Sequence, residues 1–244
     1  MTLLDTIVII AIGILAFYFI WWRDLDREEK LRTLANDLKI PFYPKGDKSL
    51  FEKLKYFSLF SISDRHKIKN MLHQGNEELD IAIFDYSFVT GSGPSGGGGA
   101  GTMAKTETSV IYFCSTKLDL PQFVIQPEKK FHQFDIFQDF DFIDYPKFSE
   151  KYLLQGSPEE SIRKLFNKEL IEFFESISED ELFVEGGGDQ IIIYKSKRRL
   201  DPKELNKFMD FGIQVLANFT TVNYDCSIMS LREKNKTWDK EAKN

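Results

Sequence analysis

Residue patterns that mark most metal and catalytic sites are missing from this sequence. Only two cysteines occur, Cys114 and Cys226, at no metal-ligand spacing, and two are too few for the disulfide framework of a small secreted module. We expect both to be reduced, buried thiols. The three histidines, His66, His73 and His132, form no HExxH pair and have no partner at ligand spacing. The sequence therefore predicts no metal site, no cofactor and no catalytic residue.

An excess of positive charge is missing as well. The chain carries 32 Lys and Arg residues against 38 Asp and Glu residues, which gives a net charge of −6. Non-specific affinity for nucleic acid comes mostly from Lys and Arg that neutralise phosphates, so we predict no nucleic-acid partner. The 244 residues are 42% hydrophobic and include 23 phenylalanines, which is enough apolar material for a globular core.

Two glycine-rich patterns lack the residues that would give them chemistry. Gly96 and Gly101 have the spacing of a phosphate-binding loop, but Thr102 and Met103 stand where Lys and Ser or Thr are required. Ser92 lies between two glycines without the GxSxG pattern of a nucleophile elbow. We interpret residues 91–106 as the glycine-rich tip of a hairpin, mobile because glycine fixes no single conformation.

An aromatic segment rich in aspartate also falls short of a known motif. Its aspartates have neither the glycine nor the distal glutamate of an EF-hand loop: Asp135, Asp139, Asp141 and Asp144. Its aromatic residues are Phe131, Phe134, Phe137, Phe140, Phe142, Tyr145 and Phe148. They form either an exposed surface for a partner or plugs for gaps in the core. We favour the core, because large apolar patches are uncommon on monomers.

The chain does contain one long uncharged run near its start. Residues Thr6 to Trp22 carry no charge, and about 20 helical residues cross a hydrocarbon core of about 30 Å. Tyr18, Trp21 and Trp22 form an aromatic belt at one end. A cleaved signal peptide needs a basic stretch before the run and small residues after it, and neither is present. A buried soluble helix is weaker still, so we predict that residues 3–22 contact the lipid bilayer.

The distribution of basic residues around this run predicts its orientation. No Lys or Arg precedes the run, whereas Arg23, Arg27, Lys30 and Arg32 follow it closely, so the positive-inside rule places the large domain in the cytoplasm. The sequons at Asn218 and Asn235 are read as chance.

The chain divides into four parts by composition. Residues 1–22 form the transmembrane anchor, 23–39 a juxtamembrane stalk helix, 40–226 a soluble domain with possible halves 40–127 and 140–226, and 227–244 a charged, flexible tail. The stalk carries Leu31, Leu34, Ala35 and Leu38 at helical spacing. This stripe is too short for a coiled coil, so we expect it to pack on its own domain instead of forming a dimer seam.

Period-two alternation and capping signals predict an α+β fold of antiparallel hairpins packed with amphipathic helices. Strands are expected at 79–90 and 108–115, and at 182–185 and 190–195 across the turn 186–189. Helices are expected near 48–56, from a capping box at Ser157–Glu160 to Ile177, and from a second capping box at Asp201–Glu204 to Leu216.

A short basic cluster follows the last expected strand. It comprises Lys195, Lys197, Arg198 and Arg199. Such a cluster binds a phosphate or a lipid headgroup in some proteins, but a run beside an acidic surface is more often a solvated strand end, which we favour.

Several of these segments resemble a family of uncharacterised bacterial single-span membrane proteins. The resemblance lies in Phe84–Phe88, Thr90–Gly93, Thr106–Phe113, Leu120–Phe123 with Pro127–Glu128, Phe148–Gly156 and Val184–Asp189, within residues 31–216. It implies one N-terminal span and an α+β domain of unknown function, with no known active site. The glycine tract Gly96 to Gly99 departs from that family, whose hairpin tip is often short and polar.

The leading hypothesis for function is a non-enzymatic, membrane-tethered binding or scaffold module in a bacterial inner membrane, with a protein partner. The alternative is a small-ligand sensor or an enzyme with a dispersed site, built from residues such as Tyr86, Asp85 and Arg199. A lipid-surface module ranks third, because the chain is acidic.

Overall fold

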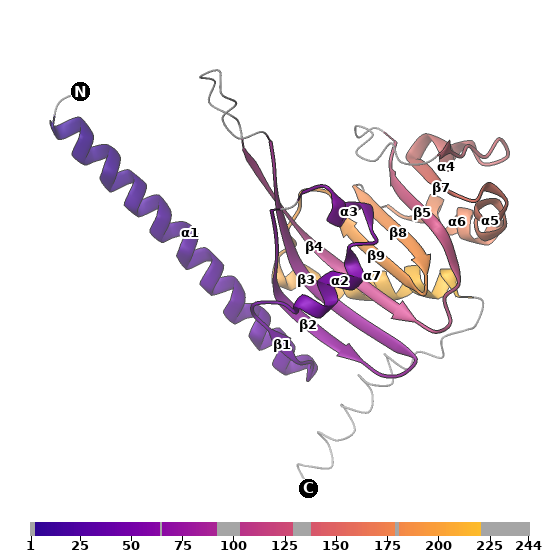
Figure 1. Ribbon diagram of the computed structural model, residues 1–244, viewed down its shortest axis with the longest axis horizontal. Coiled ribbons are helices and arrows are strands. Elements are labelled where there is room, and N and C mark those ends of the chain that lie inside the picture. The colour runs from indigo at the N-terminus through magenta and orange to yellow at the C-terminus, as the bar shows by residue number, and fades with distance from the viewer. Residues whose placement is uncertain (1–2, 64, 92–102, 129–137, 179–180, 221–244) are drawn as a thin grey trace, which may run out of the picture.

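The computed structural model describes residues 3–63, 65–91, 103–128, 138–178 and 181–220, and it confirms the α+β class (Figure 1). Its centre is a sheet of nine strands, ordered β1-β2-β3-β4-β9-β8-β5-β7-β6, in which every neighbouring pair is antiparallel. The strands are β1 Phe42–Tyr43, β2 His66–Gly75, β3 Leu79–Thr90, β4 Ala104–Ser115, β5 Leu120–Pro127, β6 Gln138–Asp139, β7 Tyr152–Ser157, β8 Leu182–Gly188 and β9 Gln190–Lys195.

Both predicted hairpins are present in this sheet, but the predicted turn 186–189 is too long, because β8 continues to Gly188. β3 and β4 pair over their full length, from Leu79 opposite Ser115 to Thr90 opposite Ala104. β8 and β9 pair next to them, and β9 lies against β4. The sheet draws strands from both 40–127 and 140–226, since β5 pairs with β7 and β8.

Seven helices complete the described part of the chain. They are α1 Leu3–Leu38, α2 Lys48–Leu54, α3 Ser58–Ser61, α4 Pro146–Lys151, α5 Glu159–Leu165, α6 Lys168–Ser176 and α7 Pro202–Phe219. α2 and α3 cover one face of the sheet, and α7 crosses the other (Figure 1). Two apolar clusters result, one on each face, so that the domain has three layers.

α1 has two halves of different character. Its side chains from residue 7 to residue 19 include many large apolar groups that are about half exposed or more, such as Phe17 at 73%. Its length and hydropathy meet the criteria for a helix that crosses a membrane. Leu31 and Ala35, in contrast, are buried in the domain core. One uninterrupted helix therefore joins an exposed apolar segment to the packed domain.

The aromatic residues that follow β6, up to Phe148 in α4, pack mostly inward. Phe140 and Phe148 are buried, and Phe142 and Tyr145 lie partly buried against the same cluster. The aliphatic Ile143 in the same segment is instead 95% exposed. The segment 131–137, with Phe131, Phe134, Phe137, His132 and Asp135, lies outside the described residues.

The region after Ser157 differs from the single helix that its apolar spacing predicts. Ser157 ends strand β7 opposite Gln122, so it does not cap a helix, and the residue at the N-cap of α5 is Pro158. The helix then stops, and Asn167 begins α6 by accepting a hydrogen bond from the backbone N–H of Leu170. The capping box of the last helix is confirmed: Asp201 and Glu204 both make the expected bonds.

Candidate functional site

The junction where α1 meets the sheet holds the most elaborate polar network of the described residues. Arg27 lies one helical turn before Leu31 and two before Ala35, so it occupies the same buried stripe of α1. Its guanidinium reaches Asp85 on β3 with both parallel bonds of a fork: Nε donates to Oδ2 at 2.8 Å, and Nη2 donates to Oδ1 at 2.7 Å. Both side chains are less than a tenth exposed, which makes this a buried ion pair.

The remaining polar atoms of this pair also have partners. Arg27 Nη1 donates to the backbone carbonyl of Leu200 at 2.6 Å. Asp85 accepts from Asn70 Nδ2 at 3.0 Å and from Ser109 Oγ at 3.1 Å. The Ser109 hydroxyl oxygen in turn accepts the backbone N–H of Leu200 at 3.1 Å. The network therefore joins α1, three neighbouring strands and the loop before α7.

A local irregularity brings Asn70 to this position. The β2–β3 register shifts between Lys69 and Leu72, and Asn70 has a positive φ of 52°. Asparagine tolerates this left-handed conformation better than most residues. The bulge turns the amide toward Asp85 in the sheet, so the local sequence supports the junction.

A second, more exposed group of charges lies one turn closer to the apolar half of α1. Asp24 accepts from Arg199 Nη1 and Nη2, each at 3.1 Å, and lies 3.8 Å from Lys69 Nζ. Arg199 also lies 3.6 Å from Glu107 on β4. Burial alone would raise the pKa of Asp24, but the charges of Arg199, Lys69 and Lys105 and the hydrogen bond from Arg199 outweigh it and lower that pKa.

An open cleft of about 340 Å³ borders this charged group. It is lined by Arg23, Asp26, Arg27, Lys30, Glu107, Arg199, Asp201 and Pro202. Its charges are of both signs, and several are already paired with each other or with the domain. Its lining residues are charged except for Pro202, so the cleft lacks the mostly apolar walls that are typical of a small-ligand pocket.

The structure does not bring the dispersed candidates Tyr86, Asp85 and Arg199 into one site. Asp85 forms an ion pair with Arg27, and Arg199 forms ion pairs with Asp24 and Glu107. Tyr86 alternates to the other face of β3, where it packs against Phe60 at 4.4 Å between ring centroids. Burial raises the pKa of the Tyr86 phenol, so it does not act as a base near neutral pH.

The basic cluster after β9 disperses in the fold. Arg198 pairs with Glu204 at 2.6 Å, and Arg199 turns to α1. Lys195 is buried with its ammonium over the ring of Phe208 at 5.9 Å. The cluster serves the ends of β9 and α7 instead of forming one anion site.

Other candidates from the sequence are separated or lie outside the described residues. Among the described residues, no group of three or more His, Cys, Asp or Glu side chains has the geometry of a metal site. His73 binds Asp80 at 2.5 Å, and the half-buried Cys114 is a free thiol that donates to Asp189 at 3.4 Å. Ser92 and Cys226 lie outside the described residues, as do most of the glycine-rich tip and the tail 227–244.

A second buried carboxylate, unnoticed in the sequence, holds α3 to the sheet. Glu185 on β8 accepts the backbone N–H groups of Ser58 at 2.6 Å and Leu59 at 3.1 Å, and the Tyr194 hydroxyl at 2.8 Å. Burial raises the pKa of Glu185 to about 7, although these three donors oppose the shift. The residue fixes the α2–α3 layer to the sheet.

Comparison with known proteins finds similarity at the level of fold. No protein-family profile matches the chain, and no curated protein sequence does. The crystal structure of the mycobacterial trehalose monomycolate transport factor A, TtfA, is similar with a TM-score of 0.56 and 8% sequence identity. The match covers 79% of this chain and 92% of that one. At this identity the likeness shows a shared fold.

Proposed function

We propose that the chain is a single-span membrane protein whose α+β domain is a non-enzymatic binding or scaffold module held close to the bilayer. In this proposal, residues 3–22 cross a bacterial inner membrane and the domain is cytoplasmic, as the basic residues after Trp22 favour. Membership in the family of uncharacterised bacterial single-span proteins is part of the same proposal.

One observation supports the proposal most strongly: α1 runs without interruption from the exposed apolar segment into the buried junction at Arg27. A helix exposed to water along an apolar run of this length is unfavourable, whereas lipid accepts it. No linker separates the apolar segment from the domain. The domain would therefore keep a fixed height and orientation at the membrane, which suits a module that presents a surface to another membrane protein.

The two buried carboxylates, Asp85 and Glu185, act within the fold and are not placed for catalysis. A catalytic carboxylate needs access to a substrate, whereas the carboxylate oxygens of Asp85 and Glu185 accept hydrogen bonds from donors within the protein. These groups join elements of the fold to each other.

The similarity to TtfA suggests which partner to test first. That protein is a transport factor by name, and we therefore take a protein partner with a role in transport as the first class to test for this chain. Affinity purification of the full-length chain from detergent-solubilised membranes tests this class. Recovery of no specific protein, together with turnover of a metabolite by the purified chain, would reverse the ranking in favour of an enzyme.

Membrane anchoring is tested by placing charge in the span. The double variant Ile10→Lys with Ile14→Lys puts two ammonium groups on exposed apolar positions of α1, at a cost of roughly 3 kcal/mol each in the centre of a bilayer. We expect the wild type to resist extraction by alkaline carbonate and the variant to be released. The control, Thr33→Lys with Asn36→Lys, adds the same charge to exposed positions below the span and should stay in the membrane. Release of the wild type by carbonate would refute the anchor.

Orientation is tested with reporters fused after Asn244. A fluorescent protein that matures only in the cytoplasm should be bright, and alkaline phosphatase should be inactive. The opposite pair of results would place the domain outside the cytoplasm.

A further inference from the structure

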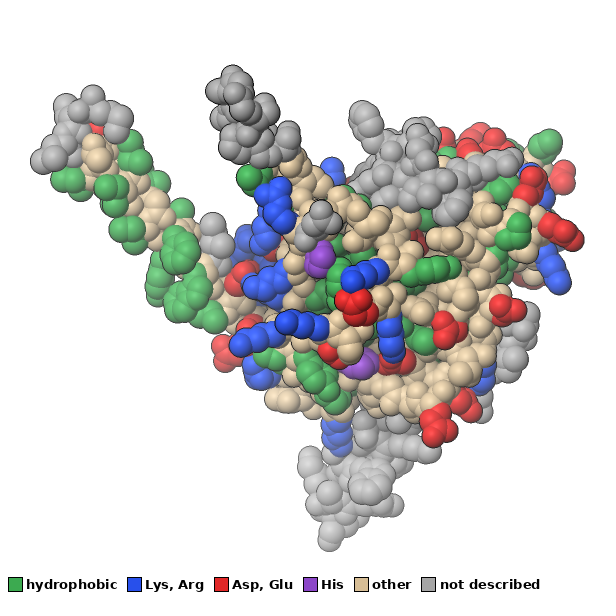
Figure 2. All heavy atoms as spheres, viewed as in Figure 1, with side chains coloured by type: hydrophobic (Ala, Val, Ile, Leu, Met, Phe, Trp, Pro, Cys, Tyr) green, Lys and Arg blue, Asp and Glu red, His purple; other side chains and the backbone are tan. Residues whose placement is uncertain are grey.

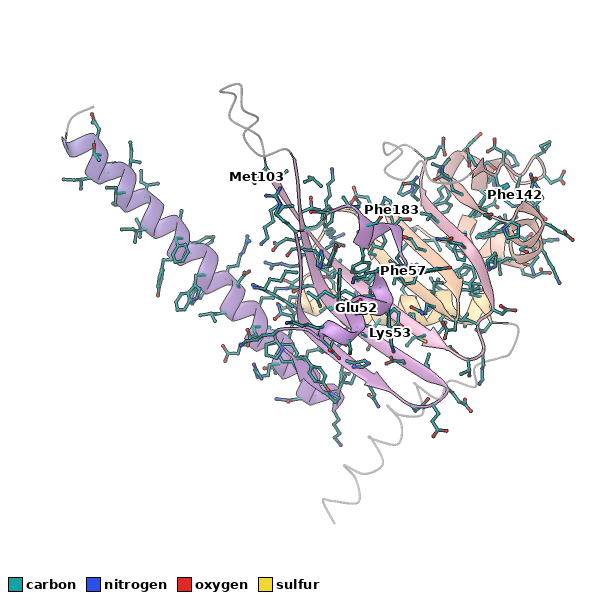
Figure 3. All side chains as sticks on the ribbon, in the orientation of Figure 1. Glu52, Lys53, Phe57, Met103, Phe142 and Phe183 are labelled. Carbon is teal, nitrogen blue, oxygen red and sulfur yellow. The ribbon has the colours of Figure 1, made fainter. Side chains whose placement is uncertain are left out.

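The outer end of the β3–β4 hairpin is an exposed surface that the junction does not use. Its described residues are Val89, Thr90, Gly91, Met103 and Ala104, which we call the hairpin end. Beside it lie three exposed basic residues, Arg65, Lys67 and Lys105, which we call the basic collar. Figure 3 shows Met103 at the far end of the hairpin, away from the body of the sheet, and this residue is 52% exposed.

The hairpin and the apolar half of α1 leave the junction in the same general direction (Figure 1). Two contacts show this direction. Arg27 contacts Asp85. Asp24, one turn nearer the start of α1, contacts Arg199, and Arg199 contacts Glu107, which lies nearer the hairpin end. In the sheet, Glu107 lies opposite Ser87, two residues beyond Asp85.

We compare how far Trp22 of the aromatic belt and the hairpin end each lie from the Arg27–Asp85 contact, along α1 and along β3. From Arg27 to Trp22 is five helical residues, about 7.5 Å at about 1.5 Å per residue. From Asp85 to Val89 is four strand residues, about 13 Å at about 3.3 Å per residue. Val89 lies opposite Lys105. If Trp22 lies at the interface of the bilayer, the row of Val89 and Lys105 reaches the headgroups, and the hairpin end extends beyond that row.

The charge on this side of the domain is opposite to that of the whole chain. Figure 2 shows Lys and Arg side chains gathered on the side of the sheet that faces the apolar half of α1. The basic residues on this side outnumber the acidic ones. The basic residues are Arg23, Arg65, Lys67, Lys69, Lys105 and Arg199, and the acidic ones are Asp24, Asp26, Glu107, which pairs with Lys105 at 2.7 Å, and Asp201. The chain as a whole has a net charge of −6. A local positive surface at this height matches the negative surface of a leaflet that contains anionic lipid.

The hairpin end has the composition expected above such a collar. None of the five described residues of the hairpin end carries a charge. Arg65 bends over the hairpin end, with Nη1 at 3.2 Å from Met103 Sδ and Nη2 donating to the Gly91 carbonyl at 3.5 Å. A long basic side chain with its stem along apolar or uncharged surface and its charge at the headgroup level is typical of a membrane interface.

We propose that the hairpin end and its basic collar form a second membrane contact, in which Arg65, Lys67 and Lys105 bind anionic lipid headgroups. This contact rests on the proposed membrane span. Two contacts, α1 and the hairpin, fix the rotation of the domain about the helix axis as well as its height. The open side of the domain, with α4 to α6, then points away from the lipid toward partners.

A depth measurement tests the contact in full-length protein. In a Cys114→Ser, Cys226→Ser background, a nitrobenzoxadiazole label is attached at Ala104→Cys in the hairpin end, or at Glu77→Cys in the turn at the opposite end of β3. The protein is reconstituted in vesicles of phosphatidylcholine with or without phosphatidylglycerol, with headgroup spin-labelled lipid as the quencher. We expect quenching at position 104, stronger with phosphatidylglycerol and weaker in high salt, and none at position 77.

Removal of the collar charges supplies the matched comparison. Arg65→Gln, Lys67→Gln and Lys105→Gln together should weaken the contact about fivefold per removed charge and abolish the effect of phosphatidylglycerol on the quenching at 104. The control triple, Lys147→Gln, Lys164→Gln and Lys168→Gln, changes the net charge equally on the exposed α4–α6 side and should leave the quenching as in the wild type.

The outcomes separate this contact from the span itself. Equal absence of quenching at 104 and 77 in protein that resists carbonate extraction would overturn the hairpin contact and leave the anchor intact. Quenching at 104 that does not depend on phosphatidylglycerol or on the collar would overturn the role of the three basic residues. Release of the chain by carbonate would overturn both proposals.

Discussion

Removal of the Asp85 charge tests the junction between α1 and the sheet. Asp85→Asn keeps the shape of the side chain but leaves the Arg27 guanidinium, with a side chain only 8% exposed, without a counter-charge. Breaking a buried pair by removing one partner costs about 3–5 kcal/mol, because a charge remains in a poorly solvated place. We expect a loss of this size in the free energy of unfolding. The amide N–H group of the new asparagine would also face a donor N–H group of Arg27, and two donors cannot form a hydrogen bond, which adds to the loss.

The assay is pulse proteolysis in urea on full-length protein in non-ionic micelles, with hydrogen exchange as a local readout. Amides of residues 23–38 should exchange faster in the variant, since Arg27 holds this part of α1 to the sheet. The double variant Arg27→Met with Asp85→Asn should lose less than Asp85→Asn alone, because no buried charge remains. Glu28→Gln, which breaks the exposed pair with Arg32 on the same helix, should cost about 0.5 kcal/mol or less. A change at Asp85 as small as that control would refute the reasoning.

Three further predictions concern the fold around the junction. The pKa of Glu185 is about 7 in the folded protein against an ordinary 4.5, so folding takes up a proton between these two pH values. The stability that this group contributes is therefore complete below about pH 4.5 and is lost as the pH rises through 7. The loss amounts to about 3 kcal/mol at most. Glu185→Gln, neutral throughout, should flatten this dependence in unfolding titrations near pH 5 and pH 8, and an unchanged slope would contradict the assignment. Gly156→Ala places a Cβ on Ile162 and at 2.7 Å from the Gln122 carbonyl oxygen, so it should cost about 1–3 kcal/mol in thermal unfolding, whereas Gly13→Ala, with open space around it, should not. Leu31→Ala should cost about 2–5 kcal/mol, since Leu31 is 1% exposed in the core, and a loss below 1 kcal/mol would show that α1 is only loosely packed.

The sequence predicts those elements whose pattern is local and regular. Apolar residues stand at every second position over much of β3 and β4, and α7 begins with a complete capping box, so these three elements were predictable. β2 was not, because its bulge at Asn70 interrupts the alternation and its residues are mostly polar. β7 was not predicted, and its last residue, Ser157, was assigned to the cap of a predicted helix because Ser157, Glu159 and Glu160 resemble a capping box, whereas Ser157 pairs with β5. In that case long-range pairing overrode a local signal.

The sequence contained a signal for the junction, the position of Arg27, but this residue was used only to predict the orientation of the membrane span. Arg27 is four residues before Leu31 and eight before Ala35, on the buried stripe, and a charge at such a position calls for a buried partner. The partner could not be found from sequence, because Asp85 is 58 residues away and is one of several acids on alternating strands. The same limit applies to Glu185, whose partners Ser58 and Leu59 come from the other end of the domain. The basic collar is also a product of strand register, since it combines β2 with β4 across β3.

The central claim is that one rigid helix both crosses the bilayer and packs into the domain, and a distance measurement in lipid nanodiscs tests it most directly. Spin labels at Gly13→Cys in the span and Glu77→Cys in the domain, in the cysteine-free background, report the distance between the two parts. The account predicts a single distribution as narrow as that of a reference pair inside the domain, Glu77→Cys with Glu172→Cys. A broad distribution for the first pair beside a narrow one for the second would show that the domain swings freely on its anchor, and would contradict the account.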